Sequence, residues 1–289
     1  MVDLHDIVTA RVDRPYAIAS AAKRRRKPPS WRGEHGRLMV IAADHPARGA
    51  LRAGDDPLAM GNRADLLRRI CTALERPGVN GVLGTPDILE DLLLLGALDD
   101  KVVIGSMNRG GLAGTSFEID DRFTAYDAGS IAASGFDGGK MLIRIDPADA
   151  GTVTTLESCA RAVGDLAGRK LMAMVEPFIS HRVDGRVRNE LSPEAMIRAM
   201  TVAAGLGTTS AYTWLKVPVV EEMERVMAAT TLPALILGGE VAADADAAYA
   251  RWGKALTLPT VQGLVIGRSL LYPPGGDVAD AVDRAVSLL

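Results

Sequence analysis

The sequence predicts a (β/α)8 TIM barrel, an α/β fold in which each of eight parallel strands leads into a helix. Its 289 residues suit one barrel domain, which typically needs about 250 residues. Short strand-like runs alternate regularly with helical runs, as in repeated βα units. The strand-like runs are mostly apolar, as expected for parallel strands buried on both faces. A doubly wound open sheet is the main alternative, but no Gly-x-Gly-x-x-Gly follows the first strand.

The strand-like runs fill the chain once from end to end. We expect them at residues 37–43, 81–84, 101–105, 139–146, 170–176, within 211–220, at 233–238 and at 263–267. The fifth run should end at Pro177, and a charged excursion at 181–190 should follow it before the next helix.

Helical segments and loops separate these strands. After the first strand, Leu66, Ile70 and Leu74 share one face at the spacing of an amphipathic helix. A further helix is expected around 123–133. The loop at 106–121 is long and rich in glycine, and long loops in compact domains are often functional.

The beginning of the chain is expected to precede the barrel. Residues 1–36 are predicted to form an N-terminal helix and a basic linker, and residues 37–289 to form the barrel domain. The basic run Lys-Arg-Arg-Arg-Lys (23–27) is followed by two prolines. One short basic run on an acidic protein is most simply a solvated linker, and contact with RNA or an acidic partner is the alternative.

The composition argues against a nucleic-acid-binding or membrane protein. The net charge of −3 gives no reason to expect nucleic acid. No apolar stretch reaches the roughly 18 residues of a membrane span, and the start lacks the basic-then-apolar order of a signal peptide. Cys71 and Cys159 lie far apart in predicted helices, so we expect reduced packing residues in a cytoplasmic protein.

Lys216 lies near the carboxyl end of the apolar run 211–220. A buried ammonium group is costly unless something offsets it. Burial favours the neutral amine, which is a nucleophile towards carbonyl groups. A lysine on a buried strand therefore indicates Schiff-base chemistry. For this residue taken alone, a strand-end lysine with its head in water is the simpler interpretation.

Polar residues gather at the carboxyl ends of the predicted strands, where the active site of such a barrel lies. They are Asp44 and His45 on strand one, Lys140, Arg144 and Asp146 on strand four, Glu176 on strand five, Lys216 on strand six, Gly238, Gly239 and Glu240 after strand seven, and Gly267, Arg268 and Ser269 after strand eight. Each has a structural explanation by itself; Glu176, for example, could simply pair with Arg144. Two lysines and two carboxylates at one barrel mouth are hard to explain as packing.

The glycines after the last two strands indicate an anion site. Gly238, Gly239 and Gly267 would let backbone N–H groups approach an anion closely. Barrel enzymes commonly bind a phosphate at these turns. Arg268 would add a planar, permanently charged guanidinium group. We therefore expect these four residues to bind a phosphate.

Six motifs together resemble those of class I, Schiff-base aldolases of sugar phosphates, over about residues 37–285. They are Val-Ile-Ala-Ala-Asp-His (40–45), Asp-Gly-Gly-Lys-Met-Leu-Ile-Arg-Ile-Asp (137–146), Met-Val-Glu-Pro (174–177), Trp-Leu-Lys-Val-Pro-Val (214–219), Leu-Gly-Gly-Glu (237–240) and Ile-Gly-Arg-Ser-Leu (266–270). They look like segments of fructose-bisphosphate and tagatose-bisphosphate aldolases. Any one motif is weak, whereas six in the right order are specific.

The resemblance implies a lyase that cleaves a phosphorylated ketose to dihydroxyacetone phosphate and an aldehyde. Lys216 would form the imine with the ketose carbonyl. Glu176 would be the acid that helps to expel water from the carbinolamine. Asp44 would take the hydroxyl proton as the carbon–carbon bond breaks, and Lys140 would hold substrate hydroxyls beside the imine. No metal and no cofactor are expected.

The chain also departs from the family pattern. His45 follows the first-strand aspartate where related enzymes often have another polar residue or arginine; here Arg48 comes further on. His45 would join the proton transfers or shape the pocket, and Arg144 is a further candidate for substrate binding. The loop at 106–115 has no clear counterpart. The chain also resembles an actinobacterial barrel group associated with inositol breakdown, which would imply cleavage of 5-dehydro-2-deoxygluconate 6-phosphate to dihydroxyacetone phosphate and malonate semialdehyde.

Several other functions are open at this point. A metal-dependent aldolase needs a histidine-rich site, but His5, His35, His45 and His181 lie in unrelated segments. A deoxyribose-phosphate-type aldolase would share the Schiff-base chemistry. A non-catalytic sugar-phosphate-binding barrel, an isomerase or an epimerase would not need an amine in an apolar wall. An exposed apolar helix face at 92–95 would favour the homo-oligomer that we expect.

Overall fold

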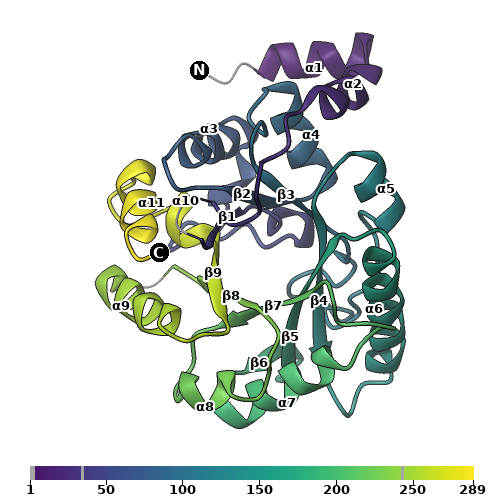
Figure 1. The fold of residues 1–289 in the computed structure, drawn as a ribbon, viewed down its shortest axis with the longest axis vertical. Coiled ribbons are helices and arrows are strands. Elements are labelled where there is room, and N and C mark those ends of the chain that lie inside the picture. The colour runs from purple at the N-terminus through teal and green to yellow at the C-terminus, as the bar shows by residue number, and fades with distance from the viewer. Residues whose placement is uncertain (1–3, 34–35, 242–243) are drawn as a thin grey trace.

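The computed structural model describes residues 4–33, 36–241 and 244–289. Within these residues eight parallel strands close into a barrel surrounded by helices, which confirms the predicted fold class (Figure 1). Around the barrel the order is β1, β2, β3, β4, β5, β7, β8 and β9, and β9 pairs with β1. The strands are β1 Leu38–Ala42, β2 Gly81–Gly84, β3 Val102–Ser106, β4 Gly138–Ile145, β5 Met172–Val183, β6 Arg186–Glu190, β7 Thr213–Pro218, β8 Ala234–Leu237 and β9 Val261–Ile266.

Most helices that cover the barrel begin at a polar side chain that caps the first turn. The caps are Asn62, Asp127, Ser192, Asp244 and Asp277, each accepting a hydrogen bond from a backbone N–H three residues on. One such cap stabilises a helix by about 1 kcal/mol. The helices are α1 Leu4–Asp13, α2 Tyr16–Arg24, η1 Pro46–Arg48, η2 Ala59–Gly61, α3 Arg63–Leu74, α4 Pro86–Leu94, α5 Ala128–Ala133, α6 Gly151–Ala167, α7 Pro193–Ala204, α8 Met223–Met227, α9 Ala245–Leu256, α10 Arg268–Leu271 and α11 Val278–Val286.

The alternation of side chains along each strand divides the core into two layers. In β1, Leu38 and Val40 belong to the cluster inside the barrel, whereas Met39 and Ile41 belong to the layer under the helices. The inner cluster contains Leu38, Val40, Ala42, Leu83, Val102, Ile104, Met172, Met174, Leu235 and Val265, with Trp31 and Trp214 packed against it. The barrel interior is thus a packed apolar core, and it supports the side chains that stand at its mouth.

The N-terminal segment contains two helices, α1 and α2, where the sequence predicted one. They lie outside the ring of helices beside α4 (Figure 1), and Arg11 pairs there with Asp91 at 2.8 Å. Arg25, in the basic run, is buried and donates to the backbone carbonyls of Lys101 at 2.8 Å and Gly135 at 2.6 Å. At this residue the basic run anchors the N-terminal segment to the barrel instead of remaining solvated.

The leucines of α4 do not form the exposed apolar face that would have favoured an oligomer. Leu92 and Leu93 are buried, and Leu94 and Leu95 are partly buried against the core. α2 packs against this helix. These leucines therefore give no support for self-association, and the homo-oligomer stays a prediction.

The fifth strand does not end at Pro177. β5 continues past it, and β6 pairs with its extension in the antiparallel sense, so the charged segment at 181–190 is a hairpin. Asp184 and Gly185 connect the two strands with φ of 50° and 74°. A two-residue type I′ turn requires two such left-handed residues, and Asp-Gly is one of its preferred sequences. The Asp-Gly pair was therefore the sequence signal for this hairpin.

The helix expected at 123–133 is shorter than predicted. α5 begins at Ala128, because Asp127 and Ser130 form a capping box that fixes its first turn. Residues 107–127 remain an irregular segment that follows β3. No helix in the described ranges is long and apolar enough to span a membrane.

Candidate active site

A cluster of four charged side chains stands at the barrel mouth above the apolar core. Asp44 continues the inward alternation of β1, and Glu176 continues that of β5 beyond Met174. Lys140 on β4 and Lys216 on β7 complete the group. The exposed fractions of Asp44, Lys140, Glu176 and Lys216 are 1%, 2%, 8% and 4%. Charges this deeply buried need partners of opposite sign.

Glu176 joins the two lysines. Its Oε1 accepts a hydrogen bond from Lys216 Nζ at 2.7 Å, and its Oε2 lies 2.5 Å from Lys140 Nζ. Lys140 Nζ also donates to Asp44 Oδ2 at 3.2 Å. Charges therefore alternate in sign from Asp44 to Lys216, which lets two ammonium groups share one mouth. The simpler interpretation of Glu176 as a partner of Arg144 is wrong.

The buried cluster shifts the pKa values of its members. Burial alone would raise the pKa of Glu176, but Lys140 and Lys216 outweigh it and lower this pKa to about 2. Burial is likewise outweighed at Asp44, where Lys140 and Arg109 hold the pKa well below its ordinary value. Burial lowers the pKa of Lys140 to about 8 against the attraction of both carboxylates. Near neutral pH both carboxylates are therefore ionised, and Lys140 is close to losing its proton.

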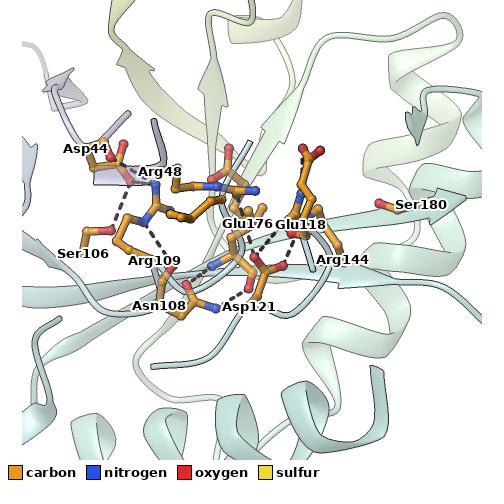
Figure 2. Close-up of polar contacts among 12 residues, drawn as sticks. Asp44, Arg48, Ser106, Asn108, Arg109, Glu118, Asp121, Arg144, Glu176 and Ser180 are labelled. Carbon is orange, nitrogen blue, oxygen red and sulfur yellow. Dashed lines mark hydrogen bonds and ion pairs between the residues drawn. The ribbon is translucent and has the colours of Figure 1, made fainter. Parts of the chain in front are cut away.

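Asp44 has one oxygen saturated with donors and one that is open. Its Oδ2 accepts from Ser106 Oγ at 3.1 Å and lies 3.2 Å from Arg109 Nη1 (Figure 2). It also accepts from Lys140 Nζ. Its Oδ1 has His45 Nδ1 at 3.9 Å and no hydrogen bond within the described part of the chain. The carboxylate is held in place through one oxygen and can accept a proton through the other.

His45 is a neutral neighbour of Asp44. Desolvation lowers its pKa to about 3, although the Asp44 carboxylate acts in the opposite direction. Its Nδ1 is buried without a hydrogen-bond partner. A Cβ atom on Gly267 would lie 3.0 Å from His45 Cε1 and 2.4 Å from the Ala42 carbonyl oxygen. Glycine at position 267 thus allows the turn after β9 to pack closely on the end of β1.

The two glycine turns lie together, because β8 and β9 are neighbouring strands. Arg268 Nη1 donates to the Arg52 carbonyl at 3.4 Å, while Arg268 Nε is buried without a partner. Gly239 has φ of 71° and open space around its Cα, whereas a Cβ on Gly238 would lie 2.6 Å from the Ile266 side chain. The under-bonded guanidinium group and the open turn suit an anion.

Arg144 stands apart from the lysine cluster. Its Nε and Nη2 donate to the two oxygens of Asp121 at 2.9 and 2.7 Å, and its Nη1 lies 3.3 Å from Glu118 Oε1 (Figure 2). Two carboxylates of the 107–127 segment thus occupy the arginine that was predicted to bind substrate. Asp146 is likewise used locally, since it accepts from the backbone N–H of Ala148 at 2.9 Å.

The sequence interpretation missed the residues that the 107–127 segment and its start bring to the site. Asn108 pairs with the backbone of Leu142, donating at 2.5 Å and accepting at 2.7 Å. This pairing fixes the segment on β4 and positions Arg109 over Asp44. Ser106, at the end of β3, completes the contacts to Asp44. The available signal was the length and glycine content of the loop, which indicated function without indicating residues.

The described ranges contain no group of three or more His, Cys, Asp or Glu side chains arranged to hold a metal ion. Of the four histidines, His35 lies outside the described residues.

Comparisons with known proteins agree with this architecture. A family model described as Cgl0159-like matches residues 36–286. The solved structure of Cgl0159 from Corynebacterium glutamicum is 54% identical, with a TM-score of 0.96, over 100% of this chain and 98% of that one. A Schiff-base-forming fructose-1,6-bisphosphate aldolase has the same fold at 19% identity and a TM-score of 0.66, over 94% of this chain and 99% of that one. A fructose-bisphosphate aldolase from Slackia heliotrinireducens has the same fold at 15% identity and a TM-score of 0.64, over 96% of this chain and 91% of that one. No curated protein matches the chain.

Proposed function

The chain belongs to the Cgl0159-like family, and from its buried lysine site we propose that it is a class I aldolase. It cleaves a phosphorylated ketose to dihydroxyacetone phosphate and an aldehyde. The observation that carries this proposal is the buried contact of 2.7 Å between Lys216 Nζ and Glu176 Oε1. An amine with an adjacent proton acceptor in an apolar wall is the arrangement that an imine-forming lysine needs.

The proposed reaction moves protons through three of the four charged residues of the cluster. Lys216 passes a proton to Glu176 and attacks the ketose carbonyl, which gives a carbinolamine. Glu176 returns that proton to the carbinolamine hydroxyl, which leaves as water and gives the iminium ion. Asp44 Oδ1 takes the proton of the substrate hydroxyl as the carbon–carbon bond breaks. The bonding electrons move into the iminium, so the step needs no metal or organic cofactor.

The Asp44 carboxylate suits the role of base because it is anchored through Oδ2. Lys140 donates to it and lies against Glu176, so this ammonium group links the two proton-transfer sites. The substrate that the sequence resemblance implies is 5-dehydro-2-deoxygluconate 6-phosphate, and the second product would then be malonate semialdehyde.

Borohydride trapping tests the proposal. Incubation with dihydroxyacetone phosphate and borohydride should inactivate the enzyme and leave a reduced adduct on the peptide that contains Lys216. An adduct on Lys140 instead would keep the reaction class and exchange the two lysines. A protein that forms no adduct with any ketose or aldehyde would be a non-catalytic sugar-phosphate-binding barrel.

Arg268→Ala is expected to raise KM for the phosphorylated substrate. Charge-assisted hydrogen bonds contribute about 1.5–3 kcal/mol each, so KM should rise by roughly 10- to 100-fold. Imine formation with a small neutral ketone should continue, because Arg268 does not contact Lys216. Steady-state kinetics with the phosphorylated ketose measures the change in KM. Borohydride trapping of acetone measures whether the imine still forms. An unchanged KM would remove Arg268 from the phosphate site.

Turnover is expected to fall as the pH rises through about 8, the pKa to which burial lowers Lys140. Below this pH the Lys140 ammonium donates to Asp44 and keeps both carboxylates ionised. Above it, that donation and that charge are lost. The profile of kcat against pH for the wild type should therefore have a descending limb that Lys140→Arg lacks, because a guanidinium group stays charged. If the descending limb persists in Lys140→Arg, the loss of activity at high pH is due to the titration of another group.

A further inference from the structure

Arg48 is a largely buried cation whose charge is poorly matched. It ends η1, and its side chain is 12% exposed. Its contact with a carboxylate is Asp121 Oδ1 at 3.8 Å, beyond hydrogen-bond distance. Within the described residues its guanidinium group makes no hydrogen bond. Burial lowers the pKa of Arg48 to about 10, and the charges of Arg144 and Arg109 act in the same direction.

The carboxylate nearest to Arg48 is already used. Asp121 is fully buried and receives two hydrogen bonds from Arg144, a bidentate pairing that satisfies both of its oxygens. Arg48 is therefore a surplus cation beside a completed ion pair. A buried charge in that position is costly unless a ligand completes it.

Arg109 has a vacant donor in the same region. Its side chain is 6% exposed, and its Nη1 is engaged by Asp44. Its Nη2 is buried without any hydrogen-bond partner. Figure 2 shows Arg48 and Arg109 between Asp44 on one side and Arg144 with its carboxylate partners on the other. Two guanidinium groups thus present unused donors close to the proposed base.

Arg109 and Arg144 lie across the barrel from the glycine turns, whereas Arg48 follows β1, which pairs with β9. Arg109 follows β3 and Arg144 ends β4, whereas the turns at 238–239 and 267–268 follow β8 and β9. In the closed order of eight strands, β3 lies opposite β8 and β4 lies opposite β9, each half of the ring away. Asp44, the proposed base for the hydroxyl that becomes the aldehyde, contacts Arg109. A substrate with its phosphate at Arg268 would therefore have its aldehyde half beside Arg109.

We infer that Arg48 and Arg109 form a second anion subsite, which binds a carboxylate on the aldehyde half of the substrate. This inference rests on the proposed aldolase function. Among the described residues and apart from Arg268, the ion-pair network of the mouth joins five cationic groups to four carboxylates; Asp146, which accepts from the Ala148 N–H, lies outside this network. The cations are Arg48, Arg109, Lys140, Arg144 and Lys216, and the carboxylates are Asp44, Glu118, Asp121 and Glu176. One surplus positive charge matches a carboxylate, whereas a phosphate dianion would bring excess negative charge beside Glu118 and Asp121.

The condensation reaction provides the test, with dihydroxyacetone phosphate as donor and three acceptor aldehydes. Succinate semialdehyde carries the carboxylate, its methyl ester is the neutral match, and glyceraldehyde phosphate carries a phosphate instead. The wild type should prefer the carboxylate over the ester in kcat/KM by about 10- to 100-fold, mostly through KM. In Arg48→Gln this ratio should fall towards one, and Arg48→Lys should restore part of it.

Arg122→Gln is the control, because Arg122 lies in the 107–127 segment that carries Arg109 but has its side chain 75% exposed; it should keep the wild-type ratio. Trapping of dihydroxyacetone phosphate on Lys216 distinguishes a failure of the proposed aldolase function from a failure of the carboxylate subsite alone. If trapping fails, the aldolase function fails and the subsite fails with it. If trapping succeeds, three results overturn the subsite alone: a wild type without preference for the carboxylate, a stronger preference for the phosphate, or a ratio unaffected by Arg48→Gln. The wild-type comparison decides the question even if Arg48→Gln does not fold.

Discussion

Lys216→Ala is expected to abolish both cleavage of the phosphorylated ketose and the borohydride-trapped adduct. Within the described residues the other amine of the cluster is Lys140, and it cannot replace Lys216 because it is held between Asp44 and Glu176. The measurement is turnover together with the intact mass after borohydride treatment. Full activity in Lys216→Ala would contradict the proposed covalent mechanism.

The fold should survive this substitution. Glu176 keeps its ion pair with Lys140 at 2.5 Å, and only its Oε1 loses a partner. An unsatisfied buried polar group costs about 1–3 kcal/mol, which is less than the roughly 5–15 kcal/mol that stabilises a typical domain. Lys254→Ala is the matched control, because Lys254 is 75% exposed and pairs with Glu224 at the surface. It should behave as the wild type in both activity and adduct formation.

The strand pattern of the barrel was readable because parallel barrel strands are apolar on both faces and regularly spaced. Errors arose where a local signal was interpreted without its tertiary setting. Pro177 was taken as a strand end, but β4 continues beside β5 and pairs Ile145 with Ile179, so the ladder extends past the proline. Arg25 was taken as solvated, but carbonyl groups of the barrel accept its hydrogen bonds. Such partners are distant in sequence and leave no local pattern.

The site residues also divide into those that the sequence could place, on strands, and those that it could not, on irregular segments. Asp44, Lys140, Glu176 and Lys216 could be placed at one mouth because each ends or lies on a barrel strand, where a period of two fixes direction. Arg48 and Arg109 could not, because they lie on irregular segments whose course depends on contacts such as that of Asn108 with Leu142. Strand residues are therefore predictable from the sequence, and loop residues of the same site require the structure.

Glu176→Gln is expected to slow turnover by about 10²–10⁴-fold, the usual contribution of a general acid–base group. Glutamine keeps the size of the side chain and can still hydrogen-bond to Lys216, but it cannot take the lysine proton or return it to the carbinolamine. The two steps that should slow are imine formation and imine hydrolysis. Single-turnover trapping with dihydroxyacetone phosphate measures the first of them.

The same variant distinguishes a chemical role from a structural one. If Glu176 delivers the proton that expels water, Glu176→Gln should accumulate the hydrated carbinolamine, which native mass spectrometry resolves from the imine. A residue that only neutralised Lys140 and Lys216 would lower stability and activity without changing the ratio of these two adducts. Glu157→Gln is the control, since Glu157 is 71% exposed and pairs with Arg161 on α6. Near-normal turnover in Glu176→Gln with an intact fold would exclude Glu176 as the acid, and Lys140, 2.5 Å from its Oε2, would then be the nearest group able to supply the proton.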